Sequence, residues 1–237
     1  MVSVFLPARR IGTARHLGLR GAVYDALLNM LIDNRLQEGA ALRVEPLADM
    51  LEVSPTPVRE ALVQLESTGL VRHIANRGYR VAELPTADEM RQIVDARTVL
   101  EVAAARRSAA QKDRAFIHEL SDIVYAQLTC VERLDDAGPS QPEALVREYL
   151  TLDHEFHYVI FRESKNPFLM RLAQTMDAQA QRARQSFRYG LDDADEAAGE
   201  HAVILRAIAR GDADAAESAT RAHMKRMLES ALGHTDR

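Results

Sequence analysis

Residues 47–84 read LADMLEVSPTPVREALVQLESTGLVRHIANRGYRVAEL and indicate two helical segments followed by a β-hairpin. The first short helix is expected near Pro46–Leu51. The second begins after Ser54, a good N-cap residue, and places Pro55 at the first helical position, where its missing N–H costs nothing. Asn76-Arg77-Gly78 lies between two short alternating runs, a pattern typical of a tight hairpin.

A helical segment over about Ala22–Leu36 precedes this stretch. Three short helices and a hairpin predict a winged helix-turn-helix. Such a domain inserts the N-terminal turn of its recognition helix, here the one that begins after Ser54, into the major groove of DNA. Thr56 and the free N–H groups of that turn are expected to bind a phosphate, and the guanidinium of Arg59 suits guanine or phosphate. Arg77 and Gly78, at the wing tip, are expected at the DNA backbone or in the minor groove. The alternative is a helix-turn-helix used only for packing, which would leave the basic hairpin tip without a purpose.

The charge of the chain is divided unevenly. The 237 residues have a formal net charge of −5, but residues 1–85 hold 10 basic and 9 acidic side chains, and the remainder holds 20 and 26. Only the first part is therefore expected to approach phosphates without repulsion. No apolar run is long enough for a transmembrane helix, Met1–Arg10 lacks the layout of a secretory signal, and the single Cys130 excludes an internal disulfide. These features predict a cytoplasmic protein.

The residues after the hairpin predict helices only. Thr86–Glu89 has the pattern of a capping box, and helix breakers then separate six segments. The segments are expected at about 86–110, 112–135, 141–163, 166–190, 194–210 and 212–232. The predicted fold is mainly α, with a winged helix-turn-helix that carries a small β-hairpin, followed by an antiparallel helical bundle. We divide the chain into a flexible basic arm (1–20), the winged helix-turn-helix (21–83), a linker (84–88) and the helical domain (89–232).

Four polar residues lie on core-facing stripes of three of these helices: Asp153, His157, His201 and His223. Asp153 and His157 are spaced i, i+4 and therefore point the same way from adjacent turns. Each histidine alone is more typical of a satisfied core residue. Burying all four is costly, however, and a shared cation would offset the cost. Three neutral imidazoles and a carboxylate suit zinc, nickel, manganese or iron, so we predict one divalent metal per chain, with zinc preferred.

Arg97 is another polar residue on a core-facing stripe, and a buried guanidinium needs an anion. One candidate partner is Glu101, one helical turn later. The other is the carboxylate of a bound effector, which Arg97 would hold in a two-pronged contact. His154 is expected to point off the stripe that carries His157, so it is not predicted as a metal ligand.

The winged helix-turn-helix is similar to that of the GntR family, whose motif is Val-Ser-Arg-Thr-Pro-Val-Arg-Glu-Ala-Leu, over most of residues 22–84. The resemblance implies DNA contacts by Thr56, Arg59 and Gly78, to which the wing adds Arg77. Pro55 stands where the family usually has an arginine that contacts the operator. The resemblance therefore does not carry the usual operator sequence over to this chain.

The helical part resembles the FCD ligand-binding domain of the FadR branch of that family, in the shorter, six-helix form. The matching segments are ARTVLEVAAARRSAA, DHEFHYVIFRESKNPFL and EHAVILRAIARGDADAAESATRAHM. In that domain the residues that match Asp153, His157, His201 and His223 bind a divalent metal. The residue that matches Arg97 helps to hold a carboxylate, which often completes the coordination of the metal.

These observations predict a DNA-binding transcription regulator, not an enzyme. We expect a homodimer that represses from a palindromic operator and responds to a small carboxylate bound beside the metal. One alternative is a metal-dependent enzyme acting on small acids, which lacks a well-placed general base near the four ligands and leaves the N-terminal domain unexplained. The other is a regulator whose metal is purely structural and that has no organic effector.

Overall fold

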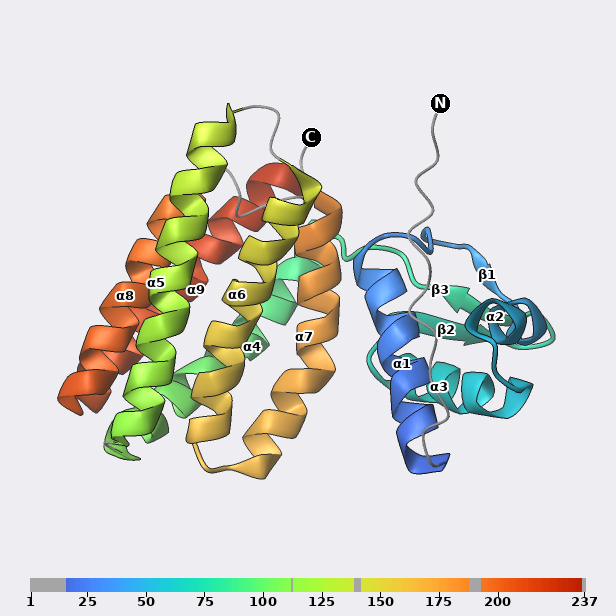
Figure 1. Ribbon diagram of the computed structural model, residues 1–237, viewed down its shortest axis with the longest axis horizontal. Coiled ribbons are helices and arrows are strands. Elements are labelled where there is room, and N and C mark those ends of the chain that lie inside the picture. Colours follow the sequence, from blue (N-terminus) through green and yellow to red (C-terminus); the bar gives the residue numbers. More distant parts are fainter. Residues whose placement is uncertain (1–15, 112, 139–141, 188–192, 236–237) are drawn as a thin grey trace. The chain divides into compact units, whose positions relative to one another are not determined.

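The computed structural model describes residues 16–111, 113–138, 142–187 and 193–235 (Figure 1). They belong to two compact units, Met1–Leu84 and Pro85–Arg237. Most of the predicted basic arm lies outside the described residues. Its last part was wrongly assigned, because helix α1 (His16–Ile32) already includes residues 16–20. Arg20 Nε lies 3.7 Å from Glu60 Oε2 of a neighbouring helix, and this ion pair supports the early start.

The first unit is a winged helix-turn-helix, as the sequence predicts. Helix α1 is followed by β1 (Ala41–Leu42), α2 (Val44–Leu51), α3 (Pro55–Ser67), β2 (Val71–Ile74) and β3 (Gly78–Val81). The three strands are antiparallel in the order β1-β3-β2. Leu27 of α1 and Leu62 of α3 are fully buried, so the apolar faces of these helices form the core of the unit.

The wing is the hairpin of β2 and β3, in which Ile74 pairs with Gly78. The three residues between them include Asn76, which has a φ of 61°, and Gly78 itself has a φ of 73°. Such left-handed backbone favours Asn and Gly, which explains why the Asn-x-Gly pattern predicts this turn.

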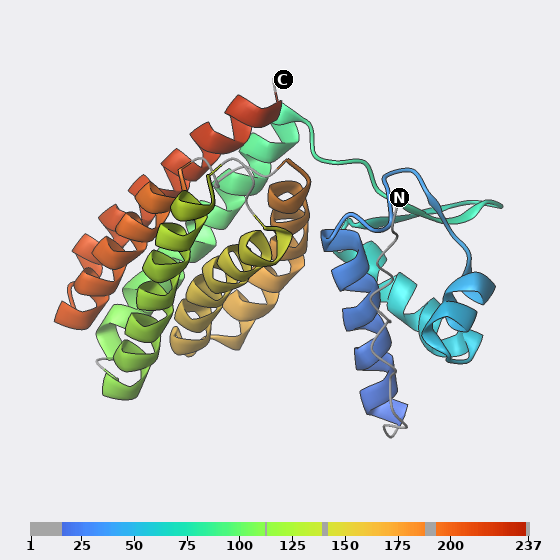
Figure 2. The same cartoon turned by 45° about the horizontal axis from the view of Figure 1, so that its top comes forward.

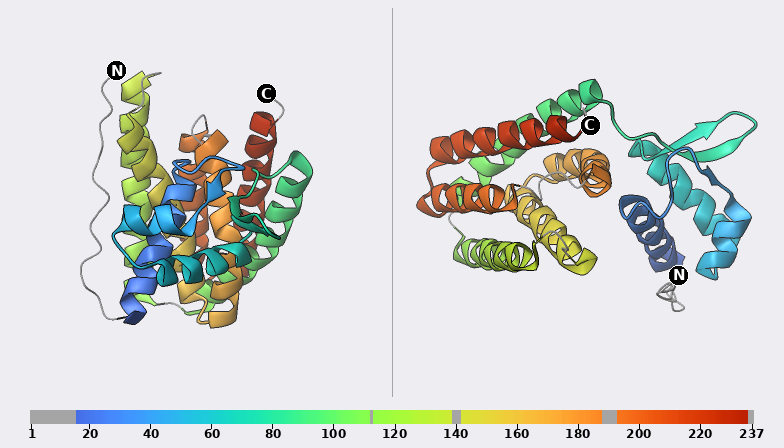
Figure 3. Two further views of the ribbon diagram at one scale, coloured as in Figure 1. Left: turned by 90° about the vertical axis from the view of Figure 1, so that its right-hand side faces the viewer. Right: turned by 90° about the horizontal axis from the view of Figure 1, so that it is seen from above.

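The second unit is a bundle of six helices within the described residues. These are α4 (Ala87–Gln111), α5 (Arg114–Ala137), α6 (Glu143–Glu163), α7 (Pro167–Phe187), α8 (Ala194–Arg210) and α9 (Ala213–Thr235). All six predicted segments are confirmed as helices, except that residues 112, 141 and 188–190 of the predicted ranges lie outside the described residues. Helices α4 and α9 pack side by side, and α5 packs against α6 and α8 (Figures 2 and 3). No helix among the described residues is long and apolar enough to span a membrane.

The core of the bundle is apolar around a polar centre. Leu120 of α5, Phe156 of α6 and Ile204 of α8 belong to one buried cluster. Among these apolar groups lie several buried polar side chains, including His157 and His201. The bundle therefore holds its imidazoles in surroundings that exclude water.

The start of α4 has the predicted capping box. The backbone N–H of Thr86 donates to Glu89 Oε2 at 2.9 Å, and the N–H of Glu89 donates to Thr86 Oγ1 at 3.3 Å. Two N–H groups without helical partners are satisfied in this way, which anchors the first turn of the bundle.

The capping box makes the first testable prediction. Thr86→Ala should lower the free energy of unfolding by about 1 kcal/mol, because it leaves the N–H of Glu89 without its acceptor. The control is Thr151→Ala, at an exposed position inside α6, where alanine should be neutral or slightly stabilising. Urea unfolding followed by circular dichroism measures both. An equal effect of the two substitutions would mean that the capping box contributes nothing.

Candidate functional site

The N-terminal turn of α3 presents the predicted DNA-reading residues to solvent. Helix α3 begins at Pro55, and Thr56 and Arg59 are exposed. Arg59 Nη2 lies 3.4 Å from Glu45 Oε1 of α2, and both side chains are more than half exposed. An exposed pair at this distance is weak, so the guanidinium of Arg59 can leave Glu45 for a nucleic-acid group.

The wing tip is exposed as well. Arg77 and Gly78 are both solvent-accessible, and the N–H of Arg77 donates to the carbonyl of Ile74 at 2.9 Å. This bond fixes the turn and leaves the arginine side chain outside it. All four residues predicted to contact DNA are therefore accessible on the first unit.

Three buried imidazoles meet in the bundle. His157 of α6, His201 of α8 and His223 of α9 each offer a ligand atom, and these atoms lie within 4.8 Å of one another. Asp153, the fourth predicted ligand, is 2% exposed but does not belong to this group. Burial lowers the pKa of His223, and the negative charge of Asp153 opposes this effect in part.

Carboxylates orient two of the rings. His157 Nδ1 lies 3.1 Å from Glu101 Oε2 of α4, and His223 Nδ1 lies 2.9 Å from Glu200 Oε2 of α8. An ionised carboxylate only accepts hydrogen bonds, so each ring donates through Nδ1. In the neutral imidazole the lone pair is then on Nε2, as metal binding requires.

The pKa shifts of Glu101 and His223 support the assignment for these two groups. Burial raises the pKa of Glu101, but His157 and Arg97 outweigh it and hold the pKa below its usual value. Burial lowers the pKa of His223 more than Glu200 raises it. Glu101 is therefore ionised and His223 neutral near pH 7.

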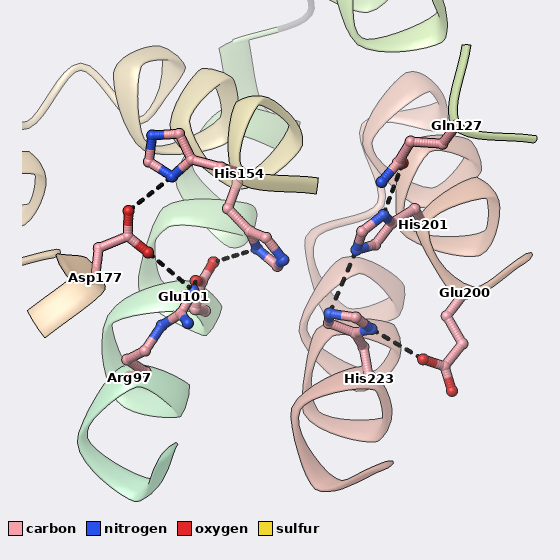
Figure 4. Close-up of polar contacts among 9 residues, drawn as sticks. Arg97, Glu101, Gln127, His154, Asp177, Glu200, His201 and His223 are labelled. Carbon is pink, nitrogen blue, oxygen red and sulfur yellow. Dashed lines mark hydrogen bonds and ion pairs between the residues drawn. The ribbon is translucent and has the colours of Figure 1, made fainter. Parts of the chain in front are cut away.

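His201 completes the group. Its Nδ1 lies 2.9 Å from Gln127 Oε1 of α5, and its ring stacks on Phe156 with centroids 3.8 Å apart. Its Nε2 is 3.3 Å from Nε2 of His223 (Figure 4). The Nε2 of His157 is buried and has no hydrogen-bond partner among the described residues. Lone pairs gathered in this way fit a divalent cation, because a cation would satisfy the buried nitrogens together.

Arg97 lies beside this group and has protein partners. Its Nη2 is 2.9 Å from Glu101 Oε1 and 3.6 Å from Asp177 Oδ1 of α7. The sequence left two partners open for Arg97, namely Glu101 and the carboxylate of an effector. In the structure, Arg97 contacts Glu101. Asp177 Oδ2 also lies 2.8 Å from His154 Nδ1, so His154 faces α7 and not the histidine group. A continuous polar chain thus runs from His154 through Asp177, Arg97 and Glu101 to His157. Figure 4 shows this chain from His154 as far as Glu101.

Several residues of this centre were missed from the sequence. Gln127 is buried on the same face of α5 as Val124 and Val131, so it carries the signal that identified the histidines. Glu101 was considered only as a partner of Arg97, not of His157. Glu200 and Asp177 are partly exposed, and no periodicity distinguishes them from surface carboxylates.

The chain matches two families. Residues 92–226 match the FCD domain, and residues 19–81 match the bacterial regulatory proteins of the gntR family. It is 28% identical over 208 residues to a Paenarthrobacter nicotinovorans protein named "Probable D-xylose utilization operon transcriptional repressor", covering 87% of this chain and 85% of that protein. It is 24% identical over 210 residues to the HTH-type transcriptional repressor RspR of Escherichia coli K12, covering 88% and 86%.

Among solved structures, E. coli McbR/YncC superposes with a TM-score of 0.76 at 19% identity. The match covers 91% of this chain and 97% of that one, and it shows a shared fold. The matched families and the two curated relatives are transcriptional regulators and not enzymes.

Proposed function

Because the chain belongs to the gntR family of transcriptional regulators and carries a C-terminal FCD domain, we propose that it is a cytoplasmic, homodimeric repressor controlled by a small carboxylate. The carboxylate binds beside a divalent metal in the helical bundle, and its binding changes the affinity of the dimer for a palindromic operator. Repression is proposed because two relatives are described as repressors. The observation that carries the proposal is the meeting of three buried imidazoles next to a buried arginine.

In the DNA-binding step, the first turn of α3 enters the major groove. Arg59 leaves Glu45 and donates to a base or phosphate, and Thr56 donates to a phosphate near the helix N-terminus. Arg77 contacts the backbone or the minor groove beside it, where the close approach needs Gly78. A dimer would present two such surfaces, which is why the operator is proposed to be palindromic.

In the metal centre, His157, His201 and His223 supply the nitrogen ligands. Asp153, one turn before His157, is the proposed fourth ligand, and its carboxylate must turn toward the group to bind. Zinc is the preferred metal, with nickel, manganese or iron as alternatives. The bound metal would supply an open coordination position that accepts a carboxylate oxygen. Arg97 then binds the effector's remaining oxygens and exchanges its longer contact, the one with Asp177, for this charge.

This exchange links the effector to the positions of the helices. Asp177 belongs to α7 and Arg97 to α4, so an effector that replaces Asp177 at Arg97 alters how these helices are held together. An effector that binds one arrangement better than the other shifts the population toward it. A structural metal without an organic effector is the remaining alternative. Carboxylate binding to Arg97→Ala and to metal-free protein distinguishes it from the proposed function.

Arg59→Ala should lower operator affinity about 5- to 150-fold, corresponding to the loss of one base contact worth about 1–3 kcal/mol. The operator is first isolated by selecting bound fragments of genomic DNA. Arg114→Ala, at an exposed position on α5, is the matched control and should bind like the wild type. Selected fragments without a palindrome would contradict the proposal, and so would an unchanged affinity of the Arg59 variant.

Zinc-loaded wild-type protein should contain one metal ion per chain by elemental analysis. His201→Ala should lose it under the same dialysis, because a nitrogen ligand is removed. His154→Ala should retain the metal, since His154 contacts Asp177 instead. Asp153→Ala tests the fourth ligand separately. Full occupancy in the His201 variant would remove that residue from the site.

Arg97→Ala should weaken binding of the effector at least about tenfold, because it removes a charged hydrogen-bond partner. A thermal-shift screen of small mono- and dicarboxylates on zinc-loaded protein identifies the effector. Retained metal content and operator binding are the controls for folding of the variant. An acid that bound equally well to wild-type, Arg97→Ala and metal-free protein would indicate a structural metal.

A further inference from the structure

Gln127 is a fully buried amide whose two ends have different surroundings. Its Oε1 lies 2.9 Å from His201 Nδ1, whereas its Nε2 is buried and has no hydrogen-bond partner among the described residues. Buried amide N–H groups are costly to leave unsatisfied, so in this orientation Nε2 needs an acceptor that the described residues do not supply.

Packing does not decide which end of Gln127 faces His201. The oxygen and nitrogen of a carboxamide have almost the same size, so the group can turn over in the same space. The hydrogen bonding of His201 therefore decides whether the oxygen or the nitrogen of Gln127 faces the ring. The ring itself is held, because it stacks on Phe156 with an angle of 15° between the planes.

Without a metal, the neutral rings allow one continuous chain of hydrogen bonds. Gln127 donates through Nε2 to His201 Nδ1, and His201 donates through Nε2 to His223 Nε2, across the 3.3 Å contact. His223 donates through Nδ1 to Glu200. In this state the oxygen of Gln127 is the end turned away from His201.

With a metal at the histidines, only the other orientation works. His201 needs its lone pair on Nε2, so Nδ1 carries the proton and requires an acceptor. Oε1 of Gln127 is that acceptor, and Nε2, with two N–H donors, becomes the end turned away from His201. A carboxylate only accepts hydrogen bonds, so it finds a partner in Gln127 in this orientation alone.

We propose that Gln127 couples metal binding to carboxylate recognition: its oxygen accepts from His201 in the metal-loaded state, and its nitrogen then donates to a carboxylate effector. The inference rests on the proposed function and adds a contact from α5 to the one from Arg97 on α4. Figure 4 shows Gln127 beside His201 and Arg97 beside Glu101. Metal loading thereby turns the amide of Gln127 over. The oxygen, which would repel a carboxylate, is replaced by the nitrogen, which donates to it.

Two substitutions separate the roles of the two ends. Gln127→Glu keeps an acceptor for His201 but offers no donor, so zinc affinity should be equal or higher. Gln127→Met removes both hydrogen bonds without adding charge, so zinc affinity should fall about 10- to 100-fold. In protein saturated with zinc, both variants should bind acetate, used as the carboxylate probe, at least tenfold more weakly than wild type. Zinc affinity is measured by competition with a chelating dye, and acetate affinity by calorimetry.

Gln92→Glu, at an exposed position on α4, is the control for the added charge and should change neither affinity. A second readout needs no altered residue. In wild-type protein labelled with ¹⁵N-glutamine, the side-chain amide signals of Gln127, assigned by their absence in Gln127→Met, should move on zinc addition. They should move again with acetate only when zinc is present.

The outcomes distinguish this inference from the function it rests on. Wild-type protein that bound no zinc, or zinc-loaded protein that bound no acetate, would overturn the proposed site and the inference with it. If wild type bound both but zinc-loaded Gln127→Glu and Gln127→Met bound acetate equally well, only the role of Gln127 would be wrong. Loss of zinc in Gln127→Glu would show that Gln127 donates to His201 and would also overturn the inference.

Discussion

Three imidazoles meet in the helical core, and a cation among them would satisfy the Nε2 of His157, which has no hydrogen-bond partner among the described residues. Glu101 and Glu200 leave His157 and His223 with lone pairs on Nε2, and Phe156 holds the ring of His201 in place. Neighbouring helices supply the groups that fix these orientations. The centre of the bundle therefore has the nitrogen lone pairs that a cation would require.

From this centre the polar contacts continue outward. Glu101 binds His157 through one oxygen and Arg97 through the other, and Arg97 also approaches Asp177 on α7. Removing one member of such a buried chain leaves its neighbours unsatisfied, so the members depend on one another. An anion that entered at Arg97 would compete with the carboxylates of Glu101 and Asp177. A ligand can thus change the bundle by exchanging partners, without creating a new charged site.

Much of this architecture follows from local pattern. Helical periodicity and the breakers between segments predicted six C-terminal helices, because each helix buries one apolar stripe. The same stripes identified the three histidines as inward-facing. Strand β1 was missed because a two-residue strand is too short to show alternation. The start of α1 was placed too late because Gly18 and Gly21 weaken the helical signal in the sequence. In the structure, contact with α3 outweighs this low helix propensity.

The partners of the imidazoles depend on helix rotation and on side-chain reach between helices, which one sequence does not encode locally. For the same reason the position of Asp153 on its helix face did not determine whether its carboxylate reaches the group.

The central claim is that the three imidazoles hold a cation. Anomalous X-ray scattering from crystals of the zinc-loaded protein tests it most directly, with data collected on both sides of the zinc absorption edge. The account predicts one strong peak per chain, about 2.0–2.1 Å from Nε2 of His157, His201 and His223. Ordered histidine rings without a peak between them, and with His201 and His223 still in direct contact, would contradict it.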